Sequence, residues 1–149
     1  MKFEGKMVLN SRREDVWNFI SEPSKVIECV PGLEEYSVEE GKRVTAKVKV
    51  SIGFIKGTFR ASSSVVKEDH QNYTAKLKLS GSGVGSGFDA LVDLKLNELE
   101  YGTEFIWLAD VNVSGPLGSL AKPMLEGYVR KIVDQLFDCI KRKLTNSTI

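Results

Sequence analysis

The sequence has few of the residues that a metal or redox site needs. It contains one histidine, His70, and two cysteines, Cys29 and Cys139, which are too far apart for a CxxC motif. Nitrogen and sulfur ligands at metal-binding spacing are therefore missing, and we expect no metal and no cofactor. In a reducing compartment we expect two free thiols, with a long-range disulfide as the lesser alternative.

Long apolar runs and an excess of charge are missing as well. The apolar stretches are far shorter than the roughly 20 residues of a membrane-spanning helix, and the start MKFEGKMVLN lacks the unbroken apolar core of a signal peptide. The net charge of +1 gives no reason to expect nucleic acid as a partner. We expect a cytoplasmic protein without a transmembrane segment, with transient contact at the inner face of the membrane as an alternative.

The composition is that of one globular domain. A chain of 149 residues, 42% apolar and 28% charged, can bury a sizeable core. We expect a single domain over residues 1–149, with a frayed tail at 145–149.

The order of hydrophobic patterns predicts an α+β fold. Residues 2–9 alternate as in a strand, and Ser11 to Glu14 has the spacing of a capping box before a helix at about 12–20. A second short helix starts near Pro23 and ends before Pro31. Residues 33–114 then read as six strands, and residues 117–144 as one long amphipathic helix, with a fresh start at Pro123 as an alternative.

Alternation along the strands predicts which face of the sheet is buried. One face is apolar and the other carries lysine, arginine and aspartate, which favours an antiparallel sheet that is wet on one side. The apolar face includes Val44, Ala46, Val48, Val50, Phe59, Ala61, Val65, Tyr73, Ala75, Leu77, Leu79, Phe88, Ala90, Val92, Leu94, Leu96, Phe105, Trp107, Ala109, Val111 and Val113. The apolar stripe of the long helix needs this face as its partner.

A glycine-rich run, SGSGVGSGF from Ser80 to Phe88, separates two of the strands. A nucleotide-binding loop is excluded because a strand follows the run and no P-loop lysine is present. We expect a two-residue type II′ turn at Gly83 and Val84, because a type I′ turn at Val84 and Gly85 would force a positive φ on a β-branched residue. In that register Gly81 faces inward and leaves space beside Leu79.

The element order resembles the helix-grip fold of the START-like (SRPBCC) superfamily, and the chain is most similar to the CoxG family, the G subunit of carbon monoxide dehydrogenase. The motifs that carry the resemblance are Asp15-Val16-Trp17, Cys29-Val30-Pro31-Gly32, the glycines from Gly81 to Gly87, Gly102-Thr103, and Val113-Ser114-Gly115-Pro116-Leu117. The fold implies a curved seven-stranded antiparallel sheet wrapped around a long C-terminal helix, with two short helices between the first two strands.

The resemblance also implies a function. CoxG is a non-catalytic accessory protein of a molybdenum hydroxylase, and the fold implies an apolar cavity for a lipid-like or quinone-like molecule. Many CoxG proteins continue into a long tail with a hydrophobic end that holds them at a membrane. Because this sequence ends at Ile149, the resemblance does not extend to such an anchor.

We expect a hydrophobic molecule to bind between the sheet and the long helix, with the short helices and the Pro31-Gly32 turn as a gate. The candidate lining residues are Ile27, Val30, Pro31, Val48, Phe59, Leu79, Gly81, Phe88, Trp107, Leu120, Met124 and Tyr128. We expect no catalytic residue, and we interpret His70 as a solvated loop residue. Two alternatives stay open: a polyketide cyclase or dehydratase using the same cavity, and a structural partner with a filled core and no ligand.

Overall fold

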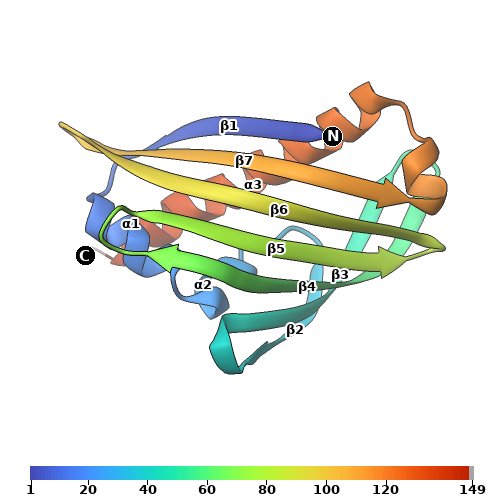
Figure 1. Cartoon of the computed structure of the whole chain (residues 1–149), viewed down its shortest axis with the longest axis horizontal. Coiled ribbons are helices and arrows are strands. Elements are labelled where there is room, and N and C mark those ends of the chain that lie inside the picture. Colours follow the sequence, from blue (N-terminus) through green and yellow to red (C-terminus); the bar gives the residue numbers. More distant parts are fainter. Residues whose placement is uncertain (148–149) are drawn as a thin grey trace.

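The computed structural model describes residues 1–147. The elements follow the predicted order of one strand, two short helices, six strands and a long helix (Figure 1). Their bounds are β1 (Lys2–Leu9), α1 (Arg13–Ile20), α2 (Pro23–Ile27), β2 (Leu33–Glu39), η1 (Glu40–Lys42), β3 (Arg43–Ile52), β4 (Ile55–Asp69), β5 (Thr74–Gly83), β6 (Ser86–Leu99), β7 (Gly102–Ser114), η2 (Gly115–Ser119) and α3 (Lys122–Ser147).

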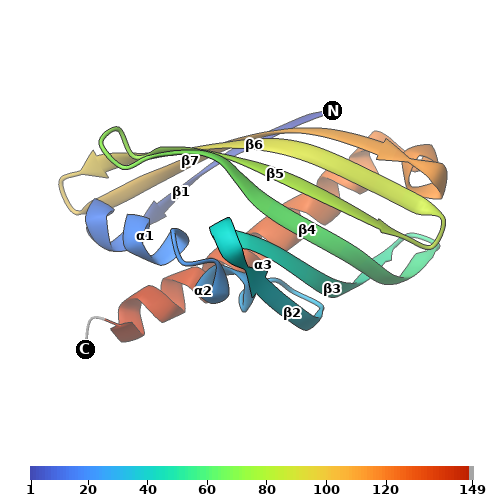
Figure 2. The same ribbon diagram turned by 60° about the horizontal axis from the view of Figure 1, so that its bottom comes forward.

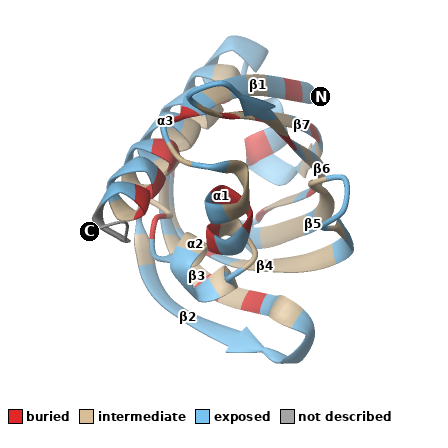
Figure 3. Ribbon diagram, turned by 90° about the vertical axis from the view of Figure 1, so that its left-hand side faces the viewer, coloured by how far each residue is buried: buried red, intermediate tan, exposed pale blue. Residues whose placement is uncertain are grey.

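The seven strands form one antiparallel sheet in the order β1-β7-β6-β5-β4-β3-β2. The sheet curls, and α3 crosses its open side, where it contacts both β1 and β3 (Figure 2). Seen from one end, α1 lies inside the ring that the sheet and α3 make (Figure 3). The architecture is therefore a curled sheet closed along its open side by one helix.

The register confirms the predicted inner face. Val48 pairs with Phe59, Leu79 with Ala90, and Leu94 with Trp107, so the apolar residues of neighbouring strands share one face. Ala46 and Ala90, at 9% and 6% exposure, are among the inner-face residues that are fully buried. Alternation with period two was enough to assign the faces of β3 to β7, because side chains alternate between an apolar inner face and a polar outer face along these strands.

The long helix begins later than the prediction from Leu117. Gly115–Ser119 form a short 3-10 turn, Leu120 is extended, and α3 starts at Lys122, so the fresh start near Pro123 is the arrangement found. Residues 145–147 continue α3, and the rest of the frayed tail predicted at 145–149 lies outside the described residues.

The predicted turn in the glycine run is wrong by one residue. Gly83 pairs with Ser86, so the turn residues are Val84 and Gly85, with φ of 53° and 73° as a type I′ turn requires. This register places Phe88 opposite Gly81, and its ring occupies the place of a Gly81 side chain. Gly81 faces inward as expected, but the space beside Leu79 is filled by Phe88.

The capping box predicted at Ser11 does not form. Arg12 is the residue before α1, and no side chain caps the helix. The carbonyl of Ser11 instead accepts a bond of 2.7 Å from the hydroxyl of Thr103, which is fully buried. Glu14 instead contacts His70 and Tyr73 on the β4–β5 turn. These tertiary bonds compete with the local bond that a capping box would need.

The expectation of two free thiols is also wrong. Cys29, just after α2, and Cys139 on α3 form a disulfide that closes a sequence separation of 110 residues. The prediction rested on a reducing compartment, whereas disulfides are typical of oxidising compartments and of hyperthermophiles. The bond ties the second short helix to the long one.

Breaking this disulfide should destabilise the fold. Reduction, or replacement of Cys29 and Cys139 by serine, should lower the free energy of unfolding by roughly 3–5 kcal/mol, because the unfolded chain regains the freedom of a long loop. Urea unfolding with and without reductant measures the difference. Thiol titration of the denatured, unreduced protein should find no reactive thiol, and finding two would contradict the bond.

Candidate functional site

The buried apolar side chains form two separate clusters. The first lies at the α1 end and contains Leu9, Val16, Trp17, Phe19, Cys29, Leu96, Phe105, Phe137, Ile140 and Leu144. The second lies at the opposite end, around the β3–β4 turn and the start of α3, and contains Ile52, Ile55, Phe59, Leu117 and Leu125. We call them the first and second clusters. The middle of the sheet's inner face lies between the two clusters.

Between the clusters, the inner face of the sheet is only half-buried. Val65, Leu77, Leu79 and Val92 point inward by register and stay partly exposed. They belong to neither cluster, nor does Ile132 on α3, which is half-buried too. An inward-facing apolar wall that is not fully covered by protein lies in the middle of the ring.

The structure brings four of the expected cavity residues together in or around the second cluster. Phe59 is 2% exposed inside it, and Phe88, Leu120 and Tyr128 pack against it. These side chains are packed together at the second cluster's end of the molecule. Three of the four are aromatic, and much of their side-chain surface is in contact with the second cluster.

The other expected cavity residues are distributed along the molecule. Val48 and Leu79 lie half-buried on the inner face. Trp107 packs against the first cluster, and Met124 is 46% exposed at the start of α3. Gly81 is covered by the ring of Phe88.

The segment expected to form a gate begins at the last residue of α2 and continues into the turn after it. Ile27, Val30 and Pro31 are half-buried there. The next residue, Gly32, has a φ of 79°, and its carbonyl accepts the amide of Lys49 on β3 at 2.8 Å. The turn is therefore fixed to the sheet by a backbone bond.

Two polar groups, one on the sheet and one on α3, have no hydrogen-bond partner within residues 1–145. The indole nitrogen of Trp107 is buried without a hydrogen bond, and the ring lies against Gly5, where a Cβ would be 2.6 Å from that nitrogen. Within residues 1–145 we find no bond to the hydroxyl of Tyr128, whose pKa is raised by burial. One donor comes from the sheet and the other from α3.

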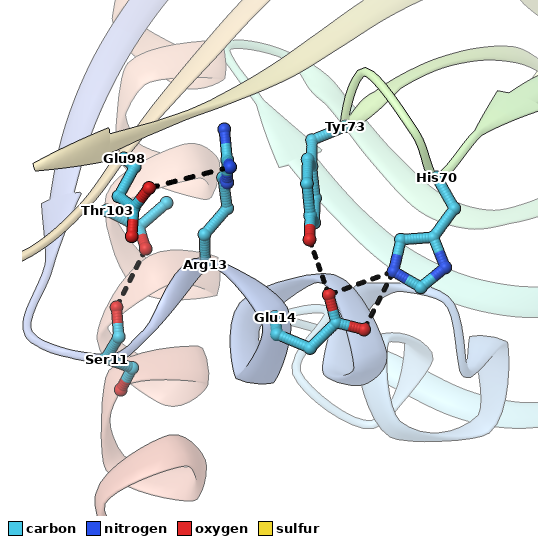
Figure 4. Close-up of polar contacts among 7 residues, drawn as sticks. All are labelled: Ser11, Arg13, Glu14, His70, Tyr73, Glu98 and Thr103. Atoms are coloured by element: carbon cyan, nitrogen blue, oxygen red, sulfur yellow. Dashed lines mark hydrogen bonds and ion pairs between the residues drawn. The ribbon is translucent and has the colours of Figure 1, made fainter.

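A polar network at the α1 end was missed by sequence reasoning. The hydroxyl of Tyr73 donates to Glu14 at 2.6 Å, and Nε2 of His70 lies 2.8 and 3.0 Å from the two carboxylate oxygens (Figure 4). The Tyr73 bond, and then the His70 bond, hold the pKa of Glu14 below its usual value. His70 is exposed in the β4–β5 turn, as we expected of a solvated loop residue, and it is in addition a partner of Glu14.

Ring contacts extend the same network. His70 stacks on Trp17 with centroids 5.4 Å apart, and the guanidinium of Arg13 lies 4.0 Å from the centre of the Tyr73 ring. Arg13 also pairs with Glu98 at 3.6 Å. The result is a set of ties from α1 to the β4–β5 turn and to the end of β6. No sequence signal could reveal the ties to Glu14, because the partners are 56 or more residues apart.

A second set of ties holds α2. Glu28 accepts bonds from Tyr36 on β2 at 2.9 Å and from Lys143 on α3 at 3.1 Å, beside the disulfide. Both short helices are therefore attached to the rest of the fold through side chains. These attachments define how far the α1 end can open.

Two hollows occur on the surface. A cleft of about 540 Å³ lies between the short helices and the end of β4, lined by Trp17, Asn18, Ser21, Glu22, Lys25, Lys42, Glu68 and His70. A groove of about 810 Å³ crosses β2 to β5. Charged and hydroxyl side chains line the groove, including Lys47, Arg60, Ser62 and Ser80, and of the expected site residues only Gly81 borders it.

Two kinds of site are not found among the described residues. No group of three or more histidine, cysteine or acidic side chains is placed to hold a metal ion. No helix in that part of the chain combines the length and hydropathy of a membrane crossing.

Comparison with protein families gives the relationship. A family model for the G subunit of carbon monoxide dehydrogenase (CoxG) matches residues 5–145. The chain belongs to the CoxG family. A comparison with curated proteins finds no match.

Solved structures show the same fold at low identity. A conserved protein from Geobacillus kaustophilus is 21% identical, with a TM-score of 0.91 over 99% of this chain and 97% of that one. A START superfamily protein from Mycobacterium smegmatis is 11% identical, with a TM-score of 0.74 over 97% of both chains. The Zhui aromatase/cyclase from Streptomyces sp. R1128 is 13% identical, with a TM-score of 0.72 over 100% of this chain and 96% of that one. This CoxG-family chain therefore has a START-like fold.

The motifs that carried the resemblance contact one another in the CoxG-family fold. The hydroxyl of Ser86, inside the glycine run, accepts the amide of Leu117 at 3.0 Å. Gly115 lies so close to the carbonyl of Gly85 that a side chain there would overlap it. These residues shape the second cluster's end of the molecule, and their role is structural.

The Glu14 network predicts a pH effect. The pKa of Glu14 is lower in the folded state than in the unfolded state, where it is about 4.3. The bonds to Glu14 therefore stabilise the fold above the unfolded pKa. This contribution is lost as pH falls through the folded pKa. Tyr73→Phe removes the hydrogen bond that lowers the pKa of Glu14 most, so this pKa should rise in the variant. NMR titration of the carboxyl group measures it. Tyr101→Phe, at an 85% exposed position, should leave that pKa unchanged; a shift only in the control would contradict the assignment.

Proposed function

We propose that this CoxG-family protein binds one hydrophobic small molecule, of lipid or quinone type, between α3 and the inner face of β5 and β6. The supporting observation is the half-buried apolar wall of Val65, Leu77, Leu79 and Val92, which belongs to neither cluster. Apolar walls inside a fold, with few polar groups, are typical of small-molecule sites. A bound molecule would complete the burial that the protein leaves unfinished.

The unpartnered donors suit a ligand that carries oxygen. A buried N–H without an acceptor costs roughly 1–3 kcal/mol, so the indole of Trp107 is a costly feature of an empty fold. A small shift of the ring would let a carbonyl or carboxyl oxygen accept its hydrogen. The hydroxyl of Tyr128 offers a second donor from the opposite wall. Ligands with oxygen at one or both ends of an apolar body fit this pattern.

Entry is proposed at the α1 end, past the segment that holds Ile27, Val30 and Pro31. Ile27, Val30 and Pro31 are half-buried and pack against neither cluster, and the ties of the segment lie at the neighbouring residues Cys29 and Gly32. Loops and short helices with few buried contacts open at the lowest free-energy cost.

The inner face supports binding better than catalysis. From Phe59 to Val65 on β4, Ala75 to Gly81 on β5, Phe88 to Leu96 on β6 and Phe105 to Val113 on β7, no inward-facing residue is charged. General acid or base catalysis needs a titratable group within reach of the substrate. A cyclase-like activity is the second candidate, because the fold is shared with an aromatase/cyclase. It would rely on Tyr128 and on positioning.

The family relationship supports a proposal about the enzyme that the ligand-bound protein serves. We propose that the loaded protein serves a molybdenum-containing hydroxylase of the carbon monoxide dehydrogenase type. Affinity capture from a native lysate, with the hydroxylase recovered only while ligand is bound, is the expected result.

The binding itself is tested by extraction. Organic solvent applied to natively purified protein, followed by mass spectrometry, should recover one apolar molecule in near-stoichiometric amount. Delipidated protein should then bind a quinone or a fatty acid. Recovery of nothing, together with no binding of either probe, would count against the proposal.

A pair of space-filling variants separates a cavity from a filled core. Val92→Phe adds volume in the half-buried middle and should weaken ligand binding at least tenfold while leaving the thermal midpoint of the delipidated protein unchanged or higher. Val16→Phe adds the same volume to the fully buried first cluster and should destabilise the fold by roughly 1–3 kcal/mol. Equal destabilisation by both would favour a filled core and a purely structural role.

A further inference from the structure

Ser63 places a hydroxyl group in the half-buried apolar wall. It pairs with Val44 on β3 and with Leu79 on β5, and directly paired residues of an antiparallel sheet share a face. Val44 is buried, at 5% exposure, and Leu79 belongs to the wall between the clusters. The side chain of Ser63 therefore lies on the inner face of the sheet, among apolar neighbours.

Along β4, Ser63 lies between the two clusters. Phe59, four residues earlier and about 13 Å away along an extended strand, belongs to the second cluster. Val65, two residues later, is part of the wall, and Tyr73, beyond the β4–β5 turn, packs against the first cluster. Ser63 itself is half-buried and belongs to neither cluster. Its hydroxyl thus lies in the middle of the inner face and not at an end.

The other inward-facing hydroxyl groups of β3 to β7 have partners within the protein. Among the described residues of these strands they belong to Ser86 and Thr103, which lie on the inner face by register. Ser86 accepts the amide of Leu117 at 3.0 Å, and Thr103 donates to the carbonyl of Ser11 at 2.7 Å. No hydrogen bond to the side chain of Ser63 is found within residues 1–145. Its hydroxyl is free to bond a ligand.

The strand pattern favours an apolar residue at position 63. The neighbours Ser62 and Ser64 lie on the outer face, where a hydroxyl meets water, and Ser62 shares a bond of 2.8 Å with Ser80. Serine is not among the residues enriched in strands, and a hydroxyl that is covered without a partner costs free energy. A departure of this kind from the hydrophobic pattern is typical of a functional position.

We propose that the hydroxyl of Ser63 bonds an oxygen that the ligand carries part-way along its apolar body. This inference rests on the proposed function, because it names the ligand class of the same site. A serine hydroxyl donates to a carbonyl or hydroxyl oxygen and accepts from a hydroxyl group. The site should therefore prefer lipids with a hydroxyl or keto group in the middle of the chain.

The donors already described do not replace Ser63 in this role. Trp107 packs against the first cluster and Tyr128 against the second, so both lie toward the ends of the inner face. They suit oxygens at the ends of a ligand, whereas Ser63 suits one between them. A site with a polar group at a fixed place discriminates against ligands that lack the matching group.

Matched fatty acids and a serine variant test the assignment. Octadecanoic acid is compared with the same acid carrying a hydroxyl or keto group at the tenth or the twelfth carbon, by displacement of a fluorescent fatty acid from the delipidated protein. The unmodified protein should bind at least one oxygenated acid as tightly as octadecanoic acid. Ser63→Ala should weaken binding of that acid about tenfold, because its oxygen loses its partner, and should leave octadecanoic acid unaffected.

Two further variants are controls. Ser64→Ala changes the neighbouring serine, which pairs with Lys78 on the outer face, and should leave every affinity unchanged. Ser63→Thr keeps the hydroxyl group and suits a strand, so it should retain binding of the oxygenated acid within about twofold. The thermal midpoint of delipidated Ser63→Ala should equal or exceed that of the unmodified protein, because no bond within the protein is lost.

Four results would overturn the assignment. They are weaker binding of every oxygenated acid than of octadecanoic acid by the unmodified protein, equal losses of both kinds of acid in Ser63→Ala, a preference for the oxygenated acid that survives Ser63→Ala, and a lower thermal midpoint of that variant. In each case octadecanoic acid still binds the unmodified protein, so the proposed function stands. No binding of any acid or of a quinone would overturn both.

Discussion

One helix has to close the open side of a seven-stranded sheet, and the rest of the structure follows from how it does so. Strands about 4.8 Å apart make a sheet about 29 Å wide, and a helix with its side chains adds about 10–12 Å. A ring of that circumference is about the size of an eight-stranded barrel, whose interior is just filled by side chains or holds one small ligand. Because α3 packs near β1 and β3, the inner faces of β5 and β6 lie farthest from it.

The two clusters and the ties at the α1 end are the consequences of this geometry. Side chains from turns and short helices fill both ends of the ring, where the elements converge. The middle keeps apolar walls that the described residues do not fully cover. At the α1 end the Glu14 and Glu28 networks and the disulfide hold the short helices in place, whereas the second cluster is held by packing and by backbone contacts at Gly85 and Gly115.

Much of the fold could be predicted because it depends on local periodicity. Alternation assigned the inner face correctly from Val44 to Val113, and the resemblance supplied the topology. The predictions that were wrong concern residues whose contacts depend on partners distant in sequence. Cys29 meets Cys139, Glu14 bonds to Tyr73 instead of forming a local cap, and Val84 adopts a positive φ in the register that places Phe88 over Gly81. The expected site residues were assigned by face alone, so the sequence could not tell the packed Phe59 from the half-buried Leu79.

The central claim is that the middle of the ring receives the apolar body of a ligand. Methyl-labelled NMR of the delipidated protein, titrated with a quinone or a fatty acid, tests it most directly. The account predicts shifts and ligand contacts at the methyl groups of Leu77, Leu79, Val92 and Ile132, with little change at Leu9 and Leu96 in the first cluster. Contacts confined to exposed residues such as Leu91 and Leu99, or no saturable shift at all, would contradict it.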